Sequence, residues 1–268
     1  MSVRARVTLE VVVALIIIEG VGLKLQNLGD LVGLGPVLLA DWVAYPFLVI
    51  AFFGIINAYN MLDGMDGLLS FNMLITLAAF CVLAGVTPGP AIIIIAGALL
   101  AFLLSNLALF PGIPKTFLGD AGSKFLGLII VCILVIAASG SVGEKEMAPV
   151  TALYVAGLPL MDMVFVTLKR VAAGRSPFTP ERTHVHHLTR ALGLSTYGSL
   201  GVICGVGILA PLLGLMLQRL GASEPLQFGL FLGLFALYCA VMTLLWRVAE
   251  GAGGRMAARA GLAGRGAG

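Results

Sequence analysis

Charged side chains are scarce in this chain of 268 residues. Aspartate, glutamate, lysine and arginine together make up 11% of it, whereas hydrophobic residues make up 60%, and the mean hydropathy is +1.08. An ordinary soluble domain has about 25% charged residues. The composition therefore excludes that class and predicts an integral membrane protein.

Cysteine is also rare, and the four cysteines all lie in apolar runs, at Cys81, Cys132, Cys204 and Cys239. Their spacing matches no metal-ligand pattern, so they are interpreted as small core residues and no disulfide framework is expected. A cleavable signal is not expected either, because the first apolar run is long and contains Glu10 and Glu19. Neither glutamate is assigned a role in a site.

The sequence consists mainly of long apolar runs. A spanning helix needs about 20 mostly apolar residues, and its backbone hydrogen bonds must close within the span. Eight windows qualify, near residues 7–25, 42–58, 68–84, 91–110, 121–138, 150–168, 200–217 and 228–246. The sequence therefore predicts an all-α fold, a polytopic membrane helix bundle with about eight transmembrane helices.

The basic residues predict the orientation, because lysine and arginine collect in short cytoplasmic loops. With the N-terminus inside, thirteen of the sixteen basic residues fall on one face, and only Lys24, Lys145 and Arg219 fall on the other. Both termini are therefore expected in the cytoplasm. The net charge of +3 is a topology signal, and no nucleic acid partner is expected, because the arginines are scattered over separate loops.

The chain is expected to form one membrane domain over residues 1–250. Residues 251–268 are rich in glycine, alanine and arginine, which predicts a disordered cytoplasmic tail near anionic lipid.

Polar residues interrupt the apolar pattern first at 57–68, NAYNMLDGMDGL. Ionisable groups at a bilayer boundary are costly and usually mark a site. Asp63 and Asp66 are three residues apart, so one helical turn places both carboxylates on one side, and two glycines leave room for a ligand.

A second cluster, FLGDAGSKFLG at 117–127, is expected on the same face. It holds Asp120 between two glycines before a new helix, where backbone amides favour an anion. A plain helix start, capped by Asp120 or Ser123, is an equal alternative for this cluster taken alone. Together with the acidic turn, this cluster would place three aspartates on one face. A magnesium ion is commonly bound by a few carboxylates and by phosphate oxygens of the substrate, so this arrangement suits magnesium.

The third cluster contains all three histidines, His184, His186 and His187, together with Arg182. Three histidines in a polar loop are poorly explained as core residues, so binding or catalysis is favoured. A zinc site is a weaker alternative, because no cysteine is near. Asp162 lies inside a preceding span, and structural support and substrate contact are equally compatible with it.

Together these strings resemble the polyprenyl-phosphate N-acetylhexosamine-1-phosphate transferases, a glycosyltransferase family 4 type. The matching segments are NAYNMLDGMDGL, FLGDAGSKFLG, and PLMDM at 159–163 followed by KRVAAGRSPFTPERTHVHHL at 169–188. HVHH preceded by SPFTPER is more similar to the branch that transfers GlcNAc-1-phosphate than to the phospho-MurNAc-pentapeptide transferases. The resemblance extends over roughly residues 1–247.

The resemblance implies a magnesium-dependent phosphoglycosyl transferase in the bacterial inner (plasma) membrane, with its active site on the cytoplasmic face. Undecaprenyl phosphate would attack the β-phosphorus of a UDP-N-acetylhexosamine such as UDP-GlcNAc and release UMP. This is the first membrane step of a cell-envelope polysaccharide, such as lipopolysaccharide. Mn²⁺ is an alternative ion, and the sequence leaves a homodimer open.

The resemblance also implies roles for single residues. Asp120 is the leading metal ligand, and Asp63 and Asp66 orient the metal-diphosphate or the nucleotide end. Phe117 stacks on the uracil, and Asn57 and Asn60 complete the hydrogen bonding around the acidic turn. Arg182, with the three histidines, binds the diphosphate or stabilises charge as UMP leaves.

One family feature is missing, because the chain has no Asp-Asp dipeptide. Family members carry such a pair on an earlier cytoplasmic loop, and residues Ser2 to Arg6 resemble the stretch directly downstream of that pair. We therefore expect the chain to begin just after the pair, without about three spans. A catalytically impaired paralogue or scaffold is accordingly one alternative function. A lipid or nucleotide-sugar carrier is another, although no internal repeat supports it.

Overall fold

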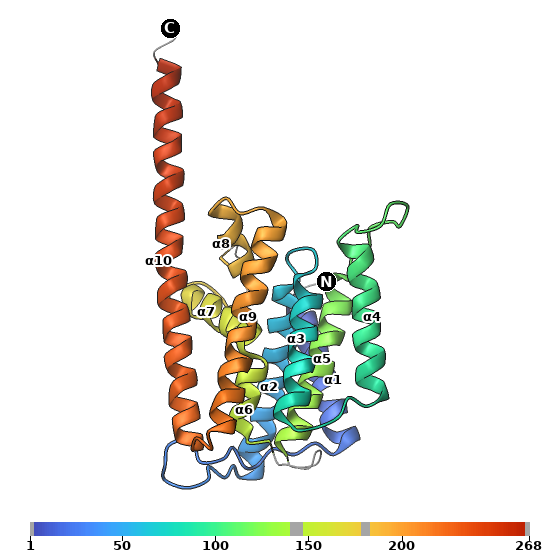
Figure 1. Ribbon diagram of the computed structural model, residues 1–268. Coiled ribbons are helices and arrows are strands. Elements are labelled where there is room, and N and C mark those ends of the chain that lie inside the picture. The colour runs from blue at the N-terminus through green and yellow to red at the C-terminus, as the bar shows by residue number, and fades with distance from the viewer. Residues whose placement is uncertain (1–2, 140–146, 178–182, 266–268) are drawn as a thin grey trace.

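The computed structural model describes residues 3–139, 147–177 and 183–265 of the chain (Figure 1). In these ranges the protein is built from helices, and its only β-type pairing is an isolated bridge between Asn27 and Leu38. The helices are α1 (Val3–Val21), α2 (Asp41–Leu62), α3 (Leu68–Leu83), α4 (Pro90–Asn106), α5 (Gly119–Ala138), α6 (Pro149–Val155), α7 (Gly157–Ala172), α8 (Val185–Ala191), α9 (Thr196–Arg219) and α10 (Glu224–Arg265).

Helix α2 lies at the centre of the bundle and packs against α1, α5 and α7. Its buried face is apolar and includes Leu48, Phe52 and Ile56. Gly127 of α5 lets the two backbones approach, because a Cβ there would lie 2.9 Å from the Cα of Ile56. This close packing holds the C-terminal end of α2 beside the N-terminal end of α5, where the acidic residues lie.

Helices α6 and α7 are one apolar segment broken at Ala156, where the chain bends by 84°. Pro159 has no N–H to donate to the carbonyl of Val155 one turn earlier, which favours a break there. Gly157 also packs tightly against α9, because a Cβ at this position would lie 2.5 Å from that of Ala210. As a result α7 leaves the direction of α6 and runs across toward α10 (Figure 1).

The membrane prediction is confirmed for the described part of the chain. Four helices are long and apolar enough to span a membrane, namely α2, α5, α9 and the Glu224–Gly251 part of α10. The bent pair of α6 and α7 makes a fifth if it counts as one span, and α3 and α4 are shorter apolar helices. The expected number of eight spans and the cytoplasmic position of both termini stay predictions.

Helix α10 extends far beyond the rest of the bundle (Figure 1). Its backbone is helical to Arg265, whereas the disorder that composition predicted for the tail stays a prediction. Glycine is unfavourable in a helix interior, but alanine and arginine are among the best helix formers and they alternate with it here. The division of the chain at residue 250 stays a prediction.

Candidate functional site

The acidic turn joins α2 to α3 at one end of the bundle. Asp63 caps the C-terminus of α2, and Gly67 starts α3 with a φ of +77°, a conformation that glycine adopts without strain. The N–H of Gly67 donates to Oδ1 of buried Asn106, at 2.6 Å, and Nδ2 of Asn106 donates to the carbonyl of Thr116, at 2.8 Å. Asn106 thus fastens the turn to the loop that leads to Asp120.

Three aspartates lie close enough for their charges to interact. Burial, followed by the charges of Asp120 and Asp66, raises the pKa of the Asp63 carboxyl. Asp66 is balanced by an ion pair with Lys115, at 2.5 Å. Among the described residues neither Asp63 nor Asp120 has an ion-pair partner. Asp63, Asp66 and Asp120 are therefore near one another, and an excess of negative charge lies between Asp63 and Asp120, but no three such residues form a metal-binding group in the described ranges.

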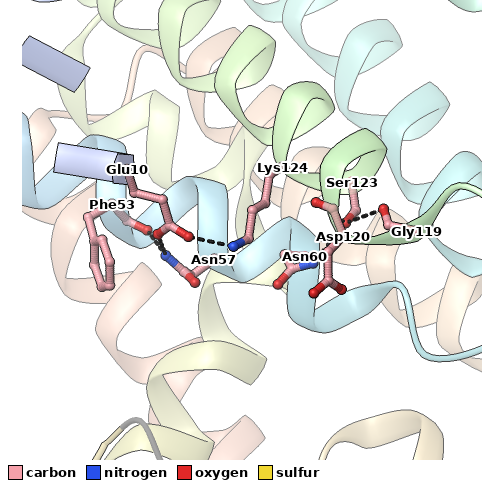
Figure 2. Close-up of polar contacts among 8 residues, drawn as sticks. All are labelled: Glu10, Phe53, Asn57, Asn60, Gly119, Asp120, Ser123 and Lys124. Atoms are coloured by element: carbon pink, nitrogen blue, oxygen red, sulfur yellow. Dashed lines mark hydrogen bonds and ion pairs between the residues drawn. The ribbon is translucent and has the colours of Figure 1, made fainter. Parts of the chain in front are cut away.

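The start of α5 is tied to the end of α2 by side-chain hydrogen bonds (Figure 2). Nδ2 of Asn60 donates to Oγ of Ser123 at 2.8 Å, and Ser123 lies near the carbonyls of Gly119 and Asp120 at 3.2 and 3.3 Å. Gly119 has a φ of +69°, so glycine is favoured at the position before Asp120. Asn60 therefore positions the segment that carries Asp120.

Asn57 is not brought to the acidic turn. Its amide donates to Oε2 of Glu10 at 2.7 Å and to the carbonyl of Phe53 at 2.8 Å, deeper in the bundle (Figure 2). Oε1 of the same glutamate pairs with Lys124, at 2.6 Å. Glu10, which the sequence left without a role, thus links α1 to α2 and α5 one turn beyond Asp120.

Residues 183–191, which include the three histidines, are called the histidine segment. Asp162 of α7 anchors this segment. One carboxylate oxygen lies 2.7 Å from Nδ1 of His184, and the other accepts the N–H of Val185 at 3.0 Å and the hydroxyl of Tyr238 at 2.8 Å. Asp162 is only 2% exposed. Of the two roles left open for it, these contacts favour structural support, which the 84° bend makes possible by turning α7 beneath the segment.

His186 joins the histidine segment to the acidic turn. Its ring lies against Gly64, where a Cβ would be 2.2 Å from Nε2. Burial, together with the neighbouring His187 and His184, lowers the pKa of His186 to about 4, although Asp162 opposes the shift. The imidazole is therefore neutral near pH 7. Its buried Nδ1 has no hydrogen-bond partner within the described residues, so this nitrogen is a group that a ligand or water can satisfy.

Phe117 and His187 are both less buried than His186. Phe117 is 73% exposed, and the Lys115 ammonium lies 5.2 Å from the centre of its ring. His187 is half-buried, with its ring centre 4.2 Å from that of His186. Arg182 lies outside the described residues. Within the described residues no three of His, Cys, Asp or Glu form a metal cage, so the structure offers no zinc-type site there.

Several residues of the site were not found from the sequence. Asn106, Tyr238 and Trp246 all sit in or at the end of apolar runs, where one polar group gives little signal. Trp246 donates its indole N–H to the carbonyl of Thr183 at 3.1 Å, just before His184. Each of them could have been noticed as a hydrogen-bonding side chain within a membrane segment, because such a group needs a partner inside the protein. The identity of that partner, however, is evident only from the fold.

The sequence was also compared with known proteins and protein families. Residues 1–138 match the model of glycosyl transferase family 4. The undecaprenyl-phosphate alpha-N-acetylglucosaminyl 1-phosphate transferase of Yersinia pestis is 32% identical over 254 residues, covering 93% of this chain and 69% of that protein. The protein of that name from Escherichia coli strain K12 is 31% identical over 254 residues (93% and 68%), and that from Pasteurella multocida is 35% identical over 156 residues (56% and 42%). The chain is thus a membrane transferase that belongs to glycosyl transferase family 4.

Proposed function

We propose that this protein transfers GlcNAc-1-phosphate from UDP-GlcNAc to undecaprenyl phosphate at the cytoplasmic face of the bacterial inner membrane. The observation that carries the proposal is the contact between the acidic turn and the histidine segment, made where His186 lies against Gly64. This contact brings carboxylates and imidazoles together at one end of a membrane bundle, which supports a site for a cation and a diphosphate there. The names of the relatives supply the donor sugar and the lipid acceptor.

The residues present fit a magnesium ion. Asp63 and Asp120 are mutually repulsive carboxylates without a described cation, and Asp66 is already paired with Lys115. Magnesium is commonly held by one or two carboxylates, with substrate phosphate oxygens and water completing its octahedral shell. Asp120 and Asp63 would hold the ion, which when bound neutralises charge on the diphosphate.

The reaction forms a bond between an oxygen of the lipid phosphate and the β-phosphorus of the UDP-sugar. The bond from that phosphorus to the bridging oxygen breaks, and UMP leaves with this oxygen and the electron pair. Phosphoryl transfer of this type depends mainly on positioning and charge stabilisation. Neutral His186 has an N–H with which it can donate a hydrogen bond to a phosphate oxygen, and His187 beside it extends the same surface.

The nucleotide end of the donor is assigned to the segment around Phe117. Phe117 offers an exposed aromatic face for uracil, with the Lys115 ammonium near the ring. Asn60 acts by holding Ser123 and hence the start of α5. Arg182, which precedes the histidines in the same segment, is proposed to contact the diphosphate.

The test uses the purified 268-residue chain with radiolabelled UDP-GlcNAc and undecaprenyl phosphate. We expect magnesium-dependent formation of labelled lipid and of UMP, both abolished by EDTA and partly restored by manganese. Binding of UDP-GlcNAc without any transfer would instead support the impaired-paralogue alternative, and transport into vesicles without UMP release would support a carrier.

A matched pair of variants connects this activity to the site. Asp120→Asn should lower transfer by about two or more powers of ten, because a charge-positioning group is lost. Asp41→Asn makes the same chemical change at the opposite end of α2 and should leave transfer nearly unchanged. Near-normal transfer by Asp120→Asn would remove this residue from the metal site.

A further inference from the structure

A groove between α7 and α10 lies outside the site described above. Its volume is about 480 Å³, and it is lined by the last two turns of α7 and by residues 239–250 of α10. Helix α10 packs against α6, α7, α8 and α9, whereas Asp120 lies in the first turn of α5, which packs mainly against α2. A ligand in this groove is therefore separate from the aspartates.

The level of this groove in the membrane is indicated by the sequence of α10. Residues 225–246 contain no charged side chain, and these 22 residues of helix are roughly 33 Å long, close to the thickness of the hydrocarbon core. Trp246 and Arg247 end this stretch. A tryptophan followed by an arginine is typical of the interface between acyl chains and headgroups. The charged end of the groove therefore lies at the headgroup level.

The charges in the groove favour an anion. It contains Lys169 and Arg247 against the single acid Glu250. The Lys169 ammonium lies 5.5 Å from the centre of the Trp246 ring, and neither Lys169 nor Arg247 forms an ion pair with another described residue. Two cations that flank one opening can hold a phosphate, which is stabilised by charge-assisted hydrogen bonds.

The rest of the lining favours a lipid over a soluble anion. Phe165, Leu168 and Cys239 also line the groove, and Leu168 is 53% exposed. An apolar wall continuous with two membrane-facing helices matches an acyl chain, while the cations match its headgroup. From this combination we propose that the groove between α7 and α10 binds an anionic phospholipid of the surrounding bilayer.

The position of the groove gives such a lipid an effect on the site. Trp246, which forms part of its wall, donates to the carbonyl of Thr183 immediately before His184. Lipid that packs against Lys169 and Trp246 therefore stabilises the contact between α10 and the histidine segment. The binding itself does not rest on the proposed transfer reaction and is tested without it.

The test uses the two tryptophans of the chain, Trp42 and Trp246. Trp42 is 81% exposed near the start of α2, at the opposite end of the bundle. In a Trp42→Phe variant, fluorescence reports Trp246 alone. The protein is reconstituted with equal mole fractions of brominated phosphatidylglycerol in phosphatidylcholine, or brominated phosphatidylcholine in phosphatidylglycerol. We expect the anionic lipid to be enriched beside Trp246 roughly fivefold over the zwitterionic lipid. This is the effect of one positive charge near the membrane surface, because Lys169 and Arg247 together carry one charge more than Glu250 balances.

Four controls make the result decisive. In a Trp246→Phe variant, Trp42 should show no such preference. Lys169→Gln combined with Arg247→Gln should abolish the preference at Trp246, whereas Arg175→Gln, which removes an exposed charge elsewhere at the same end, should retain it. A short polyprenyl phosphate at the same mole fraction should not relieve the quenching. Equal quenching by both lipids, a preference that survives the double substitution, or displacement by polyprenyl phosphate would each overturn the proposal.

Discussion

At the scale of single residues, the site depends on one glycine that faces one histidine. Gly64 is not needed for an unusual backbone conformation, because its φ is not positive. It is needed because the imidazole of His186 occupies the space where a side chain would lie. The acidic turn and the histidine segment can therefore touch only while position 64 has no Cβ.

Gly64→Ala should consequently separate the two halves of the site. A Cβ 2.2 Å from Nε2 of His186 forces the ring or the turn to move. We expect transfer to fall by about two powers of ten, comparable to the loss of one charge-stabilising group, with normal insertion into the membrane. Gly97→Ala is the control, because a Cβ there meets nothing within 4 Å. Equal activities of the two variants in the transfer assay would contradict the proposed role of the contact.

The low pKa of His186 predicts how stability depends on pH. The folded protein holds this imidazole neutral down to about pH 4, whereas the unfolded chain binds a proton near pH 6.5. The stability present above pH 6.5 should therefore be lost as the pH falls from 6.5 toward 4, by at most about 3.5 kcal/mol at roughly 1.4 kcal/mol per tenfold change in proton affinity.

Thermal unfolding in detergent between about pH 4 and 8 measures this effect. His186→Gln should flatten the decline below pH 6.5, because the group that must otherwise take up a proton is gone. His184, His187 and Asp162 surround the ring and remain in both proteins. An identical pH dependence of the two melting temperatures would show that His186 does not contribute.

At the scale of elements, the bend between α6 and α7 organises the histidine segment. It directs α7 toward α10, and Asp162 then accepts hydrogen bonds that involve α8 and α10. A straight helix would leave this carboxylate facing lipid or another span. The break therefore converts a costly buried acid into the anchor of a functional loop.

Asp162→Asn should loosen this loop more than Tyr238→Phe does. The carboxylate has contacts with His184, Val185 and Tyr238, and hydrogen bonds to a charged group are worth about 1.5–3 kcal/mol each. Tyr238→Phe removes only one of them. Hydrogen exchange of residues 183–191 should be accelerated more by the first substitution than by the second, while α2 and α5 remain protected. Unchanged exchange in Asp162→Asn would refute the anchoring role.

At the scale of the whole molecule, the three polar clusters of the candidate site lie at one end of an apolar bundle. The acidic turn, the start of α5 and α8 lie at this end in Figure 1, and the loop between α3 and α4 lies at the other. The two ends must face opposite sides of a membrane if the helices span it. The proposed cytoplasmic location of the site is thus equivalent to a prediction about topology.

Single cysteines in a cysteine-free background test this topology. Thr87→Cys lies in the exposed loop between α3 and α4, and Phe110→Cys lies in the exposed loop between α4 and α5. An impermeant thiol reagent added to intact cells should label the first and not the second, because thirteen of the sixteen basic residues were assigned to the side of Phe110. Labelling of Phe110→Cys before permeabilisation would place the site outside.

The sequence alone determined the fold class and most of the residues at the functional end. Apolar runs of spanning length allow only helices in a membrane, and polar residues at the boundary of such runs stand out because their desolvation is costly. Asp63, Asp66, Asp120 and the histidines were therefore visible as clusters before any of their contacts were known.

Only the tertiary structure decided which polar groups meet. Asn57 was expected at the acidic turn but pairs with Glu10, and the sequence left open whether Asp162 supports the histidine segment or contacts substrate. Which helices lie side by side depends on close approaches such as Gly127 against Ile56, and on a bend whose angle no periodicity encodes. Hydrogen bonds between distant segments depend on this packing, so the partners of Asn106, Tyr238 and Trp246 became evident only in the folded chain.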